Sequence, residues 1–450
     1  MNKGSASITK VVNGFWLKLK AKPLVWDALT TTFLSTIGKG IGFLIPFFIA
    51  AWFGVSSETD AFFFTYGLIL FLSGIFAPVV ESVIVPYIAE ARAKNEDVGR
   101  FVGNVLGLSG IGLLTLAVLF LLVIKPVLSI VTRFDAEVLD LVFWLLIETA
   151  PLIILLTWTG VLAGTLNAYK KFGFPALSPA FRAVINLAII FTFKDIWGVH
   201  AIAWGYVIGE AIRLIILFGA ISKFDLFSIS FSTKLNARLK EFLKTASYQV
   251  VGMMAVGLNP IVDKTMTSWL GEGSVSVLHY ADRLYMIPVT FMTTGLMVTL
   301  LSHWSGRYYE FGYQRLNKDL KKAIKVICLI TLPIMLLLIL FHQPITKLAL
   351  GRGAFDQARL TDVGWVWICY LLGFVPYMVG RPFVQMHLVL KNTKTLLHCA
   401  LFSNLLNISL NYILMKFFSV AGIALATSII SVFSLLFLSF AFNRIRGENK

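Results

Sequence analysis

The chain has 450 residues, of which 58% are hydrophobic and only 14% are charged, and its mean hydropathy is +0.82. A soluble globular protein is typically about 45–50% apolar and about 25% charged. The composition therefore excludes a water-soluble enzyme, a disordered chain, a collagen and a coiled coil. It indicates an all-α polytopic membrane protein with helices of about 20 apolar residues each.

The net charge of +16 is typical of the Lys/Arg excess that membrane proteins carry in their cytoplasmic loops, so it requires no nucleic-acid partner. The N-terminal segment lacks an apolar core followed by a small-residue cleavage site, and we expect no cleaved signal peptide. Val11–Lys20 has the pattern of an interfacial amphipathic helix. The three cysteines fall inside apolar stretches and are predicted to be buried, without disulfides or metal.

Twelve apolar segments follow in chain order and predict twelve transmembrane helices. They lie at 28–53, 61–88, 102–124, 141–167, 174–193, 200–221, 246–268, 277–304, 326–341, 363–390, 396–415 and 420–442. The longest connections are 222–245, 305–325 and 342–362. The chain is thus predicted to comprise an interfacial segment (1–27), a six-helix half (28–221), a cytoplasmic linker (222–245), a second six-helix half (246–442) and a cytoplasmic tail (443–450).

The orientation follows from the basic residues. With the N-terminus in the cytoplasm and alternating sides, the cytoplasmic segments hold 26 Lys and Arg residues and the outer loops hold 7. Because short cytoplasmic loops carry the excess of positive charge, this split predicts that both termini are cytoplasmic. A missed or an extra span would scramble the alternation after it.

Eleven charged residues fall within the predicted spans, where a charge costs at least about 2.5–3.5 kcal/mol. The basic ones are Lys39, Arg182, Arg213, Lys264, Arg283 and Arg381, and the acids are Glu81, Glu148, Glu210, Asp263 and Asp282. Arg213 follows Glu210 by one helical turn and is predicted to pair with it. Arg182 is expected to reach the cytoplasmic interface. Asp263 and Lys264 are adjacent and point to different helix faces, so each needs its own partner.

An internal repeat relates the two halves. At one constant offset, Gly40, Trp52, Gly54 and Ser57 align with Gly257, Trp269, Gly271 and Ser274. At a second, nearly equal offset, Asn186, Val199, Ile202 and Ala203 align with Asn407, Val420, Ile423 and Ala424. An even number of helices in each half predicts two parallel six-helix repeats. Transporters with such halves bind substrate between them and alternate access.

Several segments carry a family resemblance. They are Phe53–Phe62 (FGVSSETDAF), Gly160–Phe172 with Pro175–Pro179, Gly273–Ser276 with Tyr280–Leu284, Arg352–Asp356 and Lys391–Thr395. Together they resemble the MurJ/MviN-like lipid II flippases of the multidrug/oligosaccharidyl-lipid/polysaccharide exporter superfamily. The resemblance covers roughly residues 28–440. It implies a transporter without a cofactor, in the bacterial cytoplasmic membrane, for a polyprenyl-pyrophosphate-linked glycan used in peptidoglycan synthesis.

The resemblance also implies a cationic substrate site. The matched basic positions are Lys39, Lys171, Arg283 and Arg381, and we expect Lys39, Arg283 and Arg381 to line one cavity between the halves. A structural ion-pairing role remains open for Lys39 and Arg283. Asn259 is a candidate sugar contact. A second basic position of the first helix is occupied here by Ile45, Leu72–Ile75 replace a basic run, and Met286 replaces an acid. The family is usually described with fourteen helices, whereas twelve are predicted here.

Acidic residues are candidates for the gate and for ion coupling. Asp60 and Asp282 are expected to balance charge at an outer gate, although Asp60 also suits a helix cap. Asp263, with Lys264 beside it, and Glu81 are candidates for binding a cation or a proton, because intramembrane acids are commonly functional. Asn404, Asn407 and Asn411 form one polar stripe that suits interhelical hydrogen bonds or sugar contacts. No set of histidines has the spacing of a metal site.

Three other functions remain open at the level of sequence: a flippase for O-antigen or exopolysaccharide repeat units, a drug/cation antiporter of the same superfamily, and a membrane glycosyltransferase. A glycosyltransferase needs catalytic acids in a large extramembrane loop, whereas the longest outer loop, 342–362, offers only Asp356 and Asp362. No nucleotide-binding motif is present. A cation antiporter favours acid-lined cavities, and here basic residues outnumber acids within the spans.

Overall fold

Helices make up almost all of the computed structural model, which describes residues 23–228, 230, 237–390 and 392–448. Some side chains within these ranges are outside the description, and that of Lys39 is one of them. The expected interfacial helix at Val11–Lys20 and part of the 222–245 connection also lie outside the described residues.

The first half forms a bundle of seven labelled helices. They are α2 (Pro23–Phe53), α3 (Ser57–Ala93), α4 (Val98–Val131), α5 (Ala136–Thr149), α6 (Pro151–Ala168), α7 (Gly173–Trp197) and α8 (His200–Lys223). Local chemistry sets several boundaries. Ser56 and Thr59 form a capping box that starts α3. Pro151 separates α5 from α6, because proline suits the first turn of a helix but not its interior.

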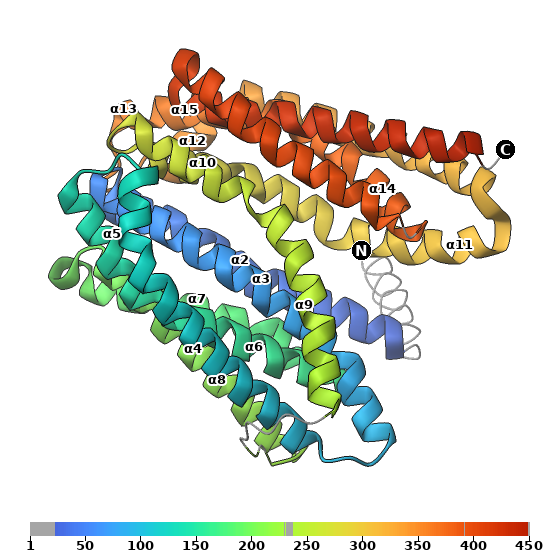
Figure 1. Ribbon diagram of the computed structural model, residues 1–450. Coiled ribbons are helices and arrows are strands. Elements are labelled where there is room, and N and C mark those ends of the chain that lie inside the picture. Colours follow the sequence, from blue (N-terminus) through green and yellow to red (C-terminus); the bar gives the residue numbers. More distant parts are fainter. Residues whose placement is uncertain (1–22, 229, 231–236, 391, 449–450) are drawn as a thin grey trace, which may run out of the picture.

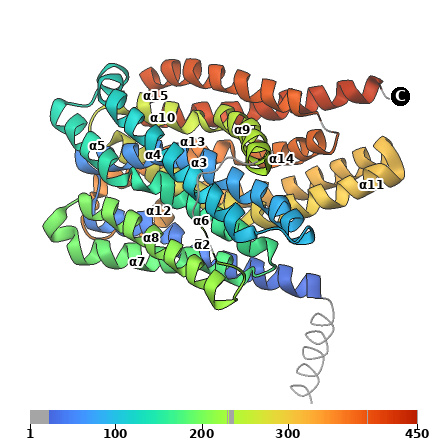
Figure 2. The ribbon, with the colours of Figure 1, turned by 60° about the horizontal axis from the view of Figure 1, so that its bottom comes forward.

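The second half begins with α9 (Ala237–Gly257), which leads into α10 (Asn259–Thr267) and a 3₁₀ turn, η1 (Ser268–Leu270). The remaining helices are α11 (Ser274–Leu340), α12 (His342–Leu350), α13 (Gln357–Leu372), α14 (Phe374–Val389) and α15 (Thr393–Glu448). In Figure 1, α2–α8 form one bundle and α10–α15 another, with α9 running between them. Figure 2 shows α7 and α8 on the side opposite α15.

The protein has an all-helical polytopic membrane fold. Eight of the described helical stretches are long and apolar enough to cross a membrane. Two of the helices exceed one crossing: α11 has 67 residues, and α15 has 56 with a backbone break at Ser419. In Figure 1 the ribbon of α11 runs outward and then turns back.

Apolar side chains lie both inside and outside the bundles. A large buried cluster, which includes Phe62, Tyr280 and Trp367, extends from one bundle into the other. A second cluster around Ile84, Leu106 and Phe242 joins α3, α4 and α9. Other large apolar side chains point outward, as on α4, where only 17% of the apolar stretch is buried. Such exposure suits helices whose outer faces contact lipid rather than water.

The helices extend beyond the predicted spans. The connection predicted at 222–245 already contains the first turns of α9, and 305–325 lies wholly within α11. The connection at 342–362 contains α12. These boundaries were predicted from hydropathy, which reports where apolar side chains end. A helix continues through charged residues because its backbone hydrogen bonds stay satisfied.

The backbone repeats the alignment of the two halves. Gly54 and its match Gly271 both have positive φ, at 66° and 96°. Gly198 has φ 54° and ψ −136°, and Ser419, at the equivalent place in the second half, has φ 51° and ψ −133°. The same unusual turn therefore joins α7 to α8 and divides α15. In the second half a serine adopts a conformation that favours glycine.

This difference predicts opposite effects of two exchanges. Ser419→Gly should stabilise the protein by about 1 kcal/mol, because it relieves backbone strain at an exposed position. Gly198→Ser should destabilise it by a similar amount, and an added Cβ there meets no atom within 4 Å, so steric clash adds nothing. The measurement is thermal unfolding of both variants in one detergent. A Ser419→Gly variant that unfolds at or below the wild-type temperature contradicts the assignment.

Candidate functional site

A cavity of about 250 Å³ lies between the two bundles. Its walls come from α2, α3, α7 and α8 on one side and from α11 on the other. The lining residues are Gly42, Phe43, Ile45, Pro46, Tyr66, Pro179, Arg182, Tyr206, His279, Arg283 and Thr290. The rings of Tyr66 and Tyr206 pack with their centroids 4.5 Å apart, and His279 stacks on Phe63 at 3.9 Å. The cavity therefore combines aromatic walls with two arginines.

The two arginines come from different halves. Arg283 of α11 was predicted to face such a cavity, and it does. Arg182 of α7 was not predicted to do so. Both guanidinium groups lie within electrostatic range of Tyr66 and Tyr206. Within the described part of the chain, Arg283 has no carboxylate at ion-pair distance, which leaves its charge available to a ligand.

The grouping of Lys39, Arg283 and Arg381 in one cavity stays a prediction. The Lys39 side chain lies outside the description. Arg381 is not among the described lining residues. Its guanidinium carbon lies 4.4 Å from the centroid of the Tyr377 ring, and it donates a hydrogen bond to the Tyr377 hydroxyl. Because the two residues are one helical turn apart on α14, a local contact within the second half holds Arg381 there.

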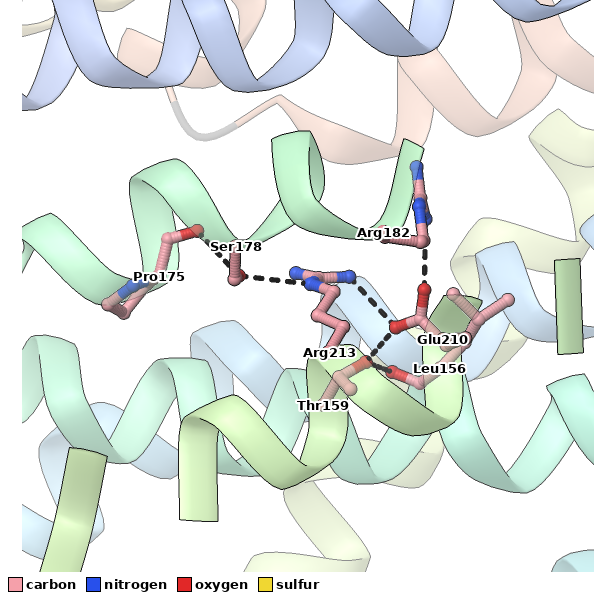
Figure 3. A network of polar contacts seen from close by, with 7 residues as sticks. All are labelled: Leu156, Thr159, Pro175, Ser178, Arg182, Glu210 and Arg213. Carbon is pink, nitrogen blue, oxygen red and sulfur yellow. Dashed lines mark hydrogen bonds and ion pairs between the residues drawn. The ribbon is translucent and has the colours of Figure 1, made fainter. Parts of the chain in front are cut away.

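A buried network holds Arg182 in place (Figure 3). The fully buried Glu210 of α8 accepts from Arg182 through Oε2 at 3.1 Å and from Arg213 through Oε1 at 2.9 Å. Thr159 also donates to Oε1, at 2.7 Å, and Arg213 Nε donates to Ser178 at 3.1 Å. The predicted pairing of Glu210 with Arg213 is confirmed. The expectation that Arg182 reaches the interface is wrong, because Glu210 offers it a charge partner inside the bundle.

Asp60 connects the two halves. Its carboxylate accepts hydrogen bonds from the backbone N–H of Gly273 at 2.7 Å and of Ser276 at 2.7 Å, and from the Ser276 hydroxyl at 2.6 Å. These donors begin α11, so Asp60 caps a helix of the second half, whereas its own helix is capped by Ser56. The negative charge also complements the helix N-terminus.

Further contacts close the same end of the molecule. Tyr280 donates to the Gly54 carbonyl at 3.0 Å, and Ala354 N–H donates to the Ala51 carbonyl at 2.8 Å. An added Cβ on Gly353 would overlap with the Ala51 carbonyl oxygen. The backbones thus approach so closely that only glycine fits at this position.

Asp263 and Lys264 have separate partners, as predicted. Asp263 Oδ1 accepts from Asn407 at 2.9 Å and from Asn411 at 2.7 Å, both on α15. Lys264 points the other way and donates to the Phe63 carbonyl at 2.6 Å, which links α10 to α3. The neutral amides satisfy Asp263 without cancelling its charge, and the described residues place no basic group at ion-pair distance from it.

The remaining predicted residues lie away from the cavity lining. Lys171 stacks over the Phe224 ring at 4.4 Å, at the corner between α6 and α7. Asn259 opens α10, and its buried Oδ1 has no hydrogen-bond partner among the described residues. Glu81 lies within electrostatic range of Arg213, and Asp282 within range of Lys264. None of these four contributes to the described cavity wall.

Sequence reasoning missed Arg182, the tyrosine pair and His279 as cavity residues. Arg182 carried one signal, since it is a charged residue inside a predicted span. The missing step was the packing of α7 against α8, which brings Arg182 to Glu210, 28 residues further along the chain.

A helical membrane fold with two bundles and a cationic cavity between them defines a polytopic membrane transporter. Comparison with solved structures supports this fold. The fold resembles an inward-facing multidrug resistance MATE family transporter of the MOP superfamily, with a TM-score of 0.74 at 16% identity over 92% of this chain and 96% of that one. At this identity the match shows the fold alone.

The particular family follows from closer matches. The family profile "Lipid II flippase MurJ" matches residues 49–447, and the chain belongs to this family. It is 30% identical to the lipid II flippase MurJ of Thermosipho africanus over 418 residues, which cover 91% of this chain and 83% of that protein. It is 28% identical to the probable lipid II flippase MurJ of Rickettsia prowazekii over 416 residues, 91% and 82% of the two chains.

A solved structure agrees with this membership. The structure titled "Lipid II flippase MurJ, inward closed conformation" has a TM-score of 0.78 and 26% identity, and the match covers 93% of this chain and 87% of that one. The resemblance found in the sequence motifs is therefore confirmed. The protein is a multi-pass membrane protein of a transporter family and not an enzyme.

Proposed function

We propose that this protein flips lipid II across the bacterial cytoplasmic membrane by alternating access and so supplies peptidoglycan synthesis. The observation that carries the proposal is the cavity between the halves, which is lined by Arg182 and Arg283 in a chain of the lipid II flippase family. A flippase for O-antigen or exopolysaccharide repeat units is the alternative, because its substrates share the polyprenyl diphosphate.

The chemistry of the substrate explains the arginines. A diphosphate that crosses about 30 Å of hydrocarbon loses its hydration. Guanidinium groups replace part of that hydration with charge-assisted, bidentate hydrogen bonds. The cavity therefore favours an anionic head group and disfavours the cationic substrates of a drug antiporter. The cavity volume of about 250 Å³ is smaller than the about 300–1,000 Å³ of most small-molecule pockets. The cavity therefore suits the phosphate groups better than a whole glycan.

We propose twelve spans with both termini in the cytoplasm. The 26 to 7 distribution of basic residues supports this topology. The lengths of α11 and α15 also support it, since each suits two crossings. In Figure 1 the ends at α5 and α13 lie together, and the C-terminus and the turn of α11 lie at the opposite end. The contacts around Asp60 then close the outer end.

Reconstitution in liposomes tests the transport function. Wild-type protein should move labelled lipid II, and Arg283→Gln should slow this by about 10- to 100-fold, the value of one charge-assisted hydrogen bond. Arg283→Lys should recover part of the rate, because lysine keeps the charge but not the fork. Each rate is measured as head-group accessibility over time.

The control is Arg352→Gln, which removes the same charge from an exposed outer loop. Movement of lipid II in protein-free liposomes at the wild-type rate, or an unaffected Arg283→Gln variant, excludes the proposed mechanism. Transport of a repeat-unit lipid but not of lipid II would support the alternative function, a flippase for repeat units.

The Asp60 cap should keep the outer end closed. In a background in which all three cysteines are serine, Asp60→Ala should increase labelling of a His279→Cys side chain by an impermeant thiol reagent added outside. The reason is that the buried backbone donors of Gly273 and Ser276 lose their acceptor. Labelling is followed by the mass shift of the protein.

Asp356→Ala is the matched control, because Asp356 caps its own helix, α13, and does not join the halves. Equal labelling with and without Asp60 contradicts the gate.

The same reagent checks the topology: a cysteine at Gln357 should react from outside and one at Asn95 should not. Reaction at Asn95 contradicts the twelve-span arrangement.

We also propose that Asp263 takes up a proton or a monovalent cation during the transport cycle. Its charge has only neutral partners among the described residues, and it lies where α10 meets α15. Asp263→Asn should leave folding intact and abolish any acceleration of flipping by a sodium or proton gradient. Transport is measured in liposomes under each gradient. A variant that keeps the wild-type response to the gradient rules out this role.

A further inference from the structure

The network around Glu210 brings two guanidinium groups to one carboxylate. Arg182 and Arg213 share the carboxylate of Glu210, and Glu81 lies within electrostatic range of Arg213 but not among the partners of Arg182. A buried ion pair already costs desolvation energy, and a second buried cation adds to this cost. Arg213 alone satisfies the charge of Glu210 one helical turn away. The pairing within α8 therefore does not explain why Arg182 is there.

The positions of the two arginines differ. The Arg182 side chain is 26% exposed and lines the cavity, whereas that of Arg213 is 15% exposed and is not among the described lining residues. Figure 3 shows the two guanidinium groups reaching Glu210 from different directions. Among the described residues, Arg182 Nε has no hydrogen-bond partner. The Arg182 guanidinium group thus reaches the cavity and keeps a donor that no described residue occupies.

We propose that Arg182 is a substrate-binding residue and that the phosphate groups of the substrate are bound between Arg182 of the first half and Arg283 of the second. This inference rests on the proposed function, in which the substrate is a polyprenyl diphosphate. Arginine matches phosphate oxygens through its planar fork of donors. Because the two residues belong to different halves, a ligand that bridges them also bridges the elements that move during alternating access.

Glu210 and Arg213 are positioning residues for Arg182. Glu210 fixes the guanidinium through Oε2. Arg213 and Thr159 occupy Oε1, and the charge of Arg213 offsets that of Glu210. Without Arg213, the whole charge of Glu210 would act on Arg182 and weaken its attraction for an anion in the cavity. A residue outside the described cavity wall should therefore control anion affinity, which a purely structural role does not predict.

Binding of inorganic pyrophosphate tests the inference on the full chain in nanodiscs of zwitterionic lipid, by calorimetry. Arg182→Gln should weaken binding by about 10- to 100-fold, and Arg182→Lys by less. Arg213→Gln should also weaken binding. The double variant Arg213→Gln/Glu210→Gln has the same net charge as the wild type and should recover part of the affinity. Arg352→Gln, on the exposed outer loop, should bind as wild type.

Thermal unfolding checks that each variant is folded. If Arg182→Gln does not fold, Arg182→Lys and the Arg213/Glu210 pair of variants decide the question. The inference is overturned if pyrophosphate binds equally to wild type and Arg182→Gln, or if the double variant binds no better than Arg213→Gln.

Flipping in liposomes separates this inference from the proposed function. If wild type flips lipid II and Arg182→Gln does so equally well, the inference fails and the proposed function stands. If wild type flips no polyprenyl diphosphate, the proposed function fails, while the effect of Arg182 and Arg213 on pyrophosphate binding still decides whether they form an anion site.

Discussion

The cost of placing a charge in a low-dielectric interior governs how this protein is built. Three buried acids, Asp60, Glu210 and Asp263, offset that cost with different kinds of partner. Asp60 uses backbone donors at a helix start, Glu210 uses two guanidinium groups, and Asp263 uses side-chain amides. Asp60 and Asp263 keep their negative charge among neutral donors, whereas the charge of Glu210 is offset by two guanidinium groups.

The Asp60 cap and the cavity share one helix, α11. Both occur where α11 meets the first bundle: its first turn binds Asp60, and Arg283 lies about two turns further along it. Any movement of α11 that breaks the cap therefore also moves Arg283 relative to Arg182. One helix thus carries both the contacts with Asp60 and the Arg283 side chain of the proposed anion site.

The sequence predicted features that depend on neighbours within one helix or on lipid exposure. The apolar segments located the helices, the spacing of Glu210 and Arg213 predicted their pairing, and the adjacency of Asp263 and Lys264 predicted separate partners. It did not predict contacts between helices. Arg182 lies 28 residues from Glu210 and Asp60 lies 213 from Gly273, so only packing brings each pair together. Arg381 contacts Tyr377 one helical turn away on α14, and its place in the predicted cavity stays a prediction.

The position of Ile45 completes this argument. The family resemblance implies a basic residue at this place in α2, yet Ile45 is 2% exposed and lines the cavity. The positive charge enters the same cavity from α7 instead, through Arg182. A diphosphate responds to the charge and donors that reach it rather than to the helix that supplies them. In the proposed site, Arg182 can therefore supply the charge that Ile45 lacks. Glu210 holds the Arg182 guanidinium group and is itself held by Arg213 and Thr159.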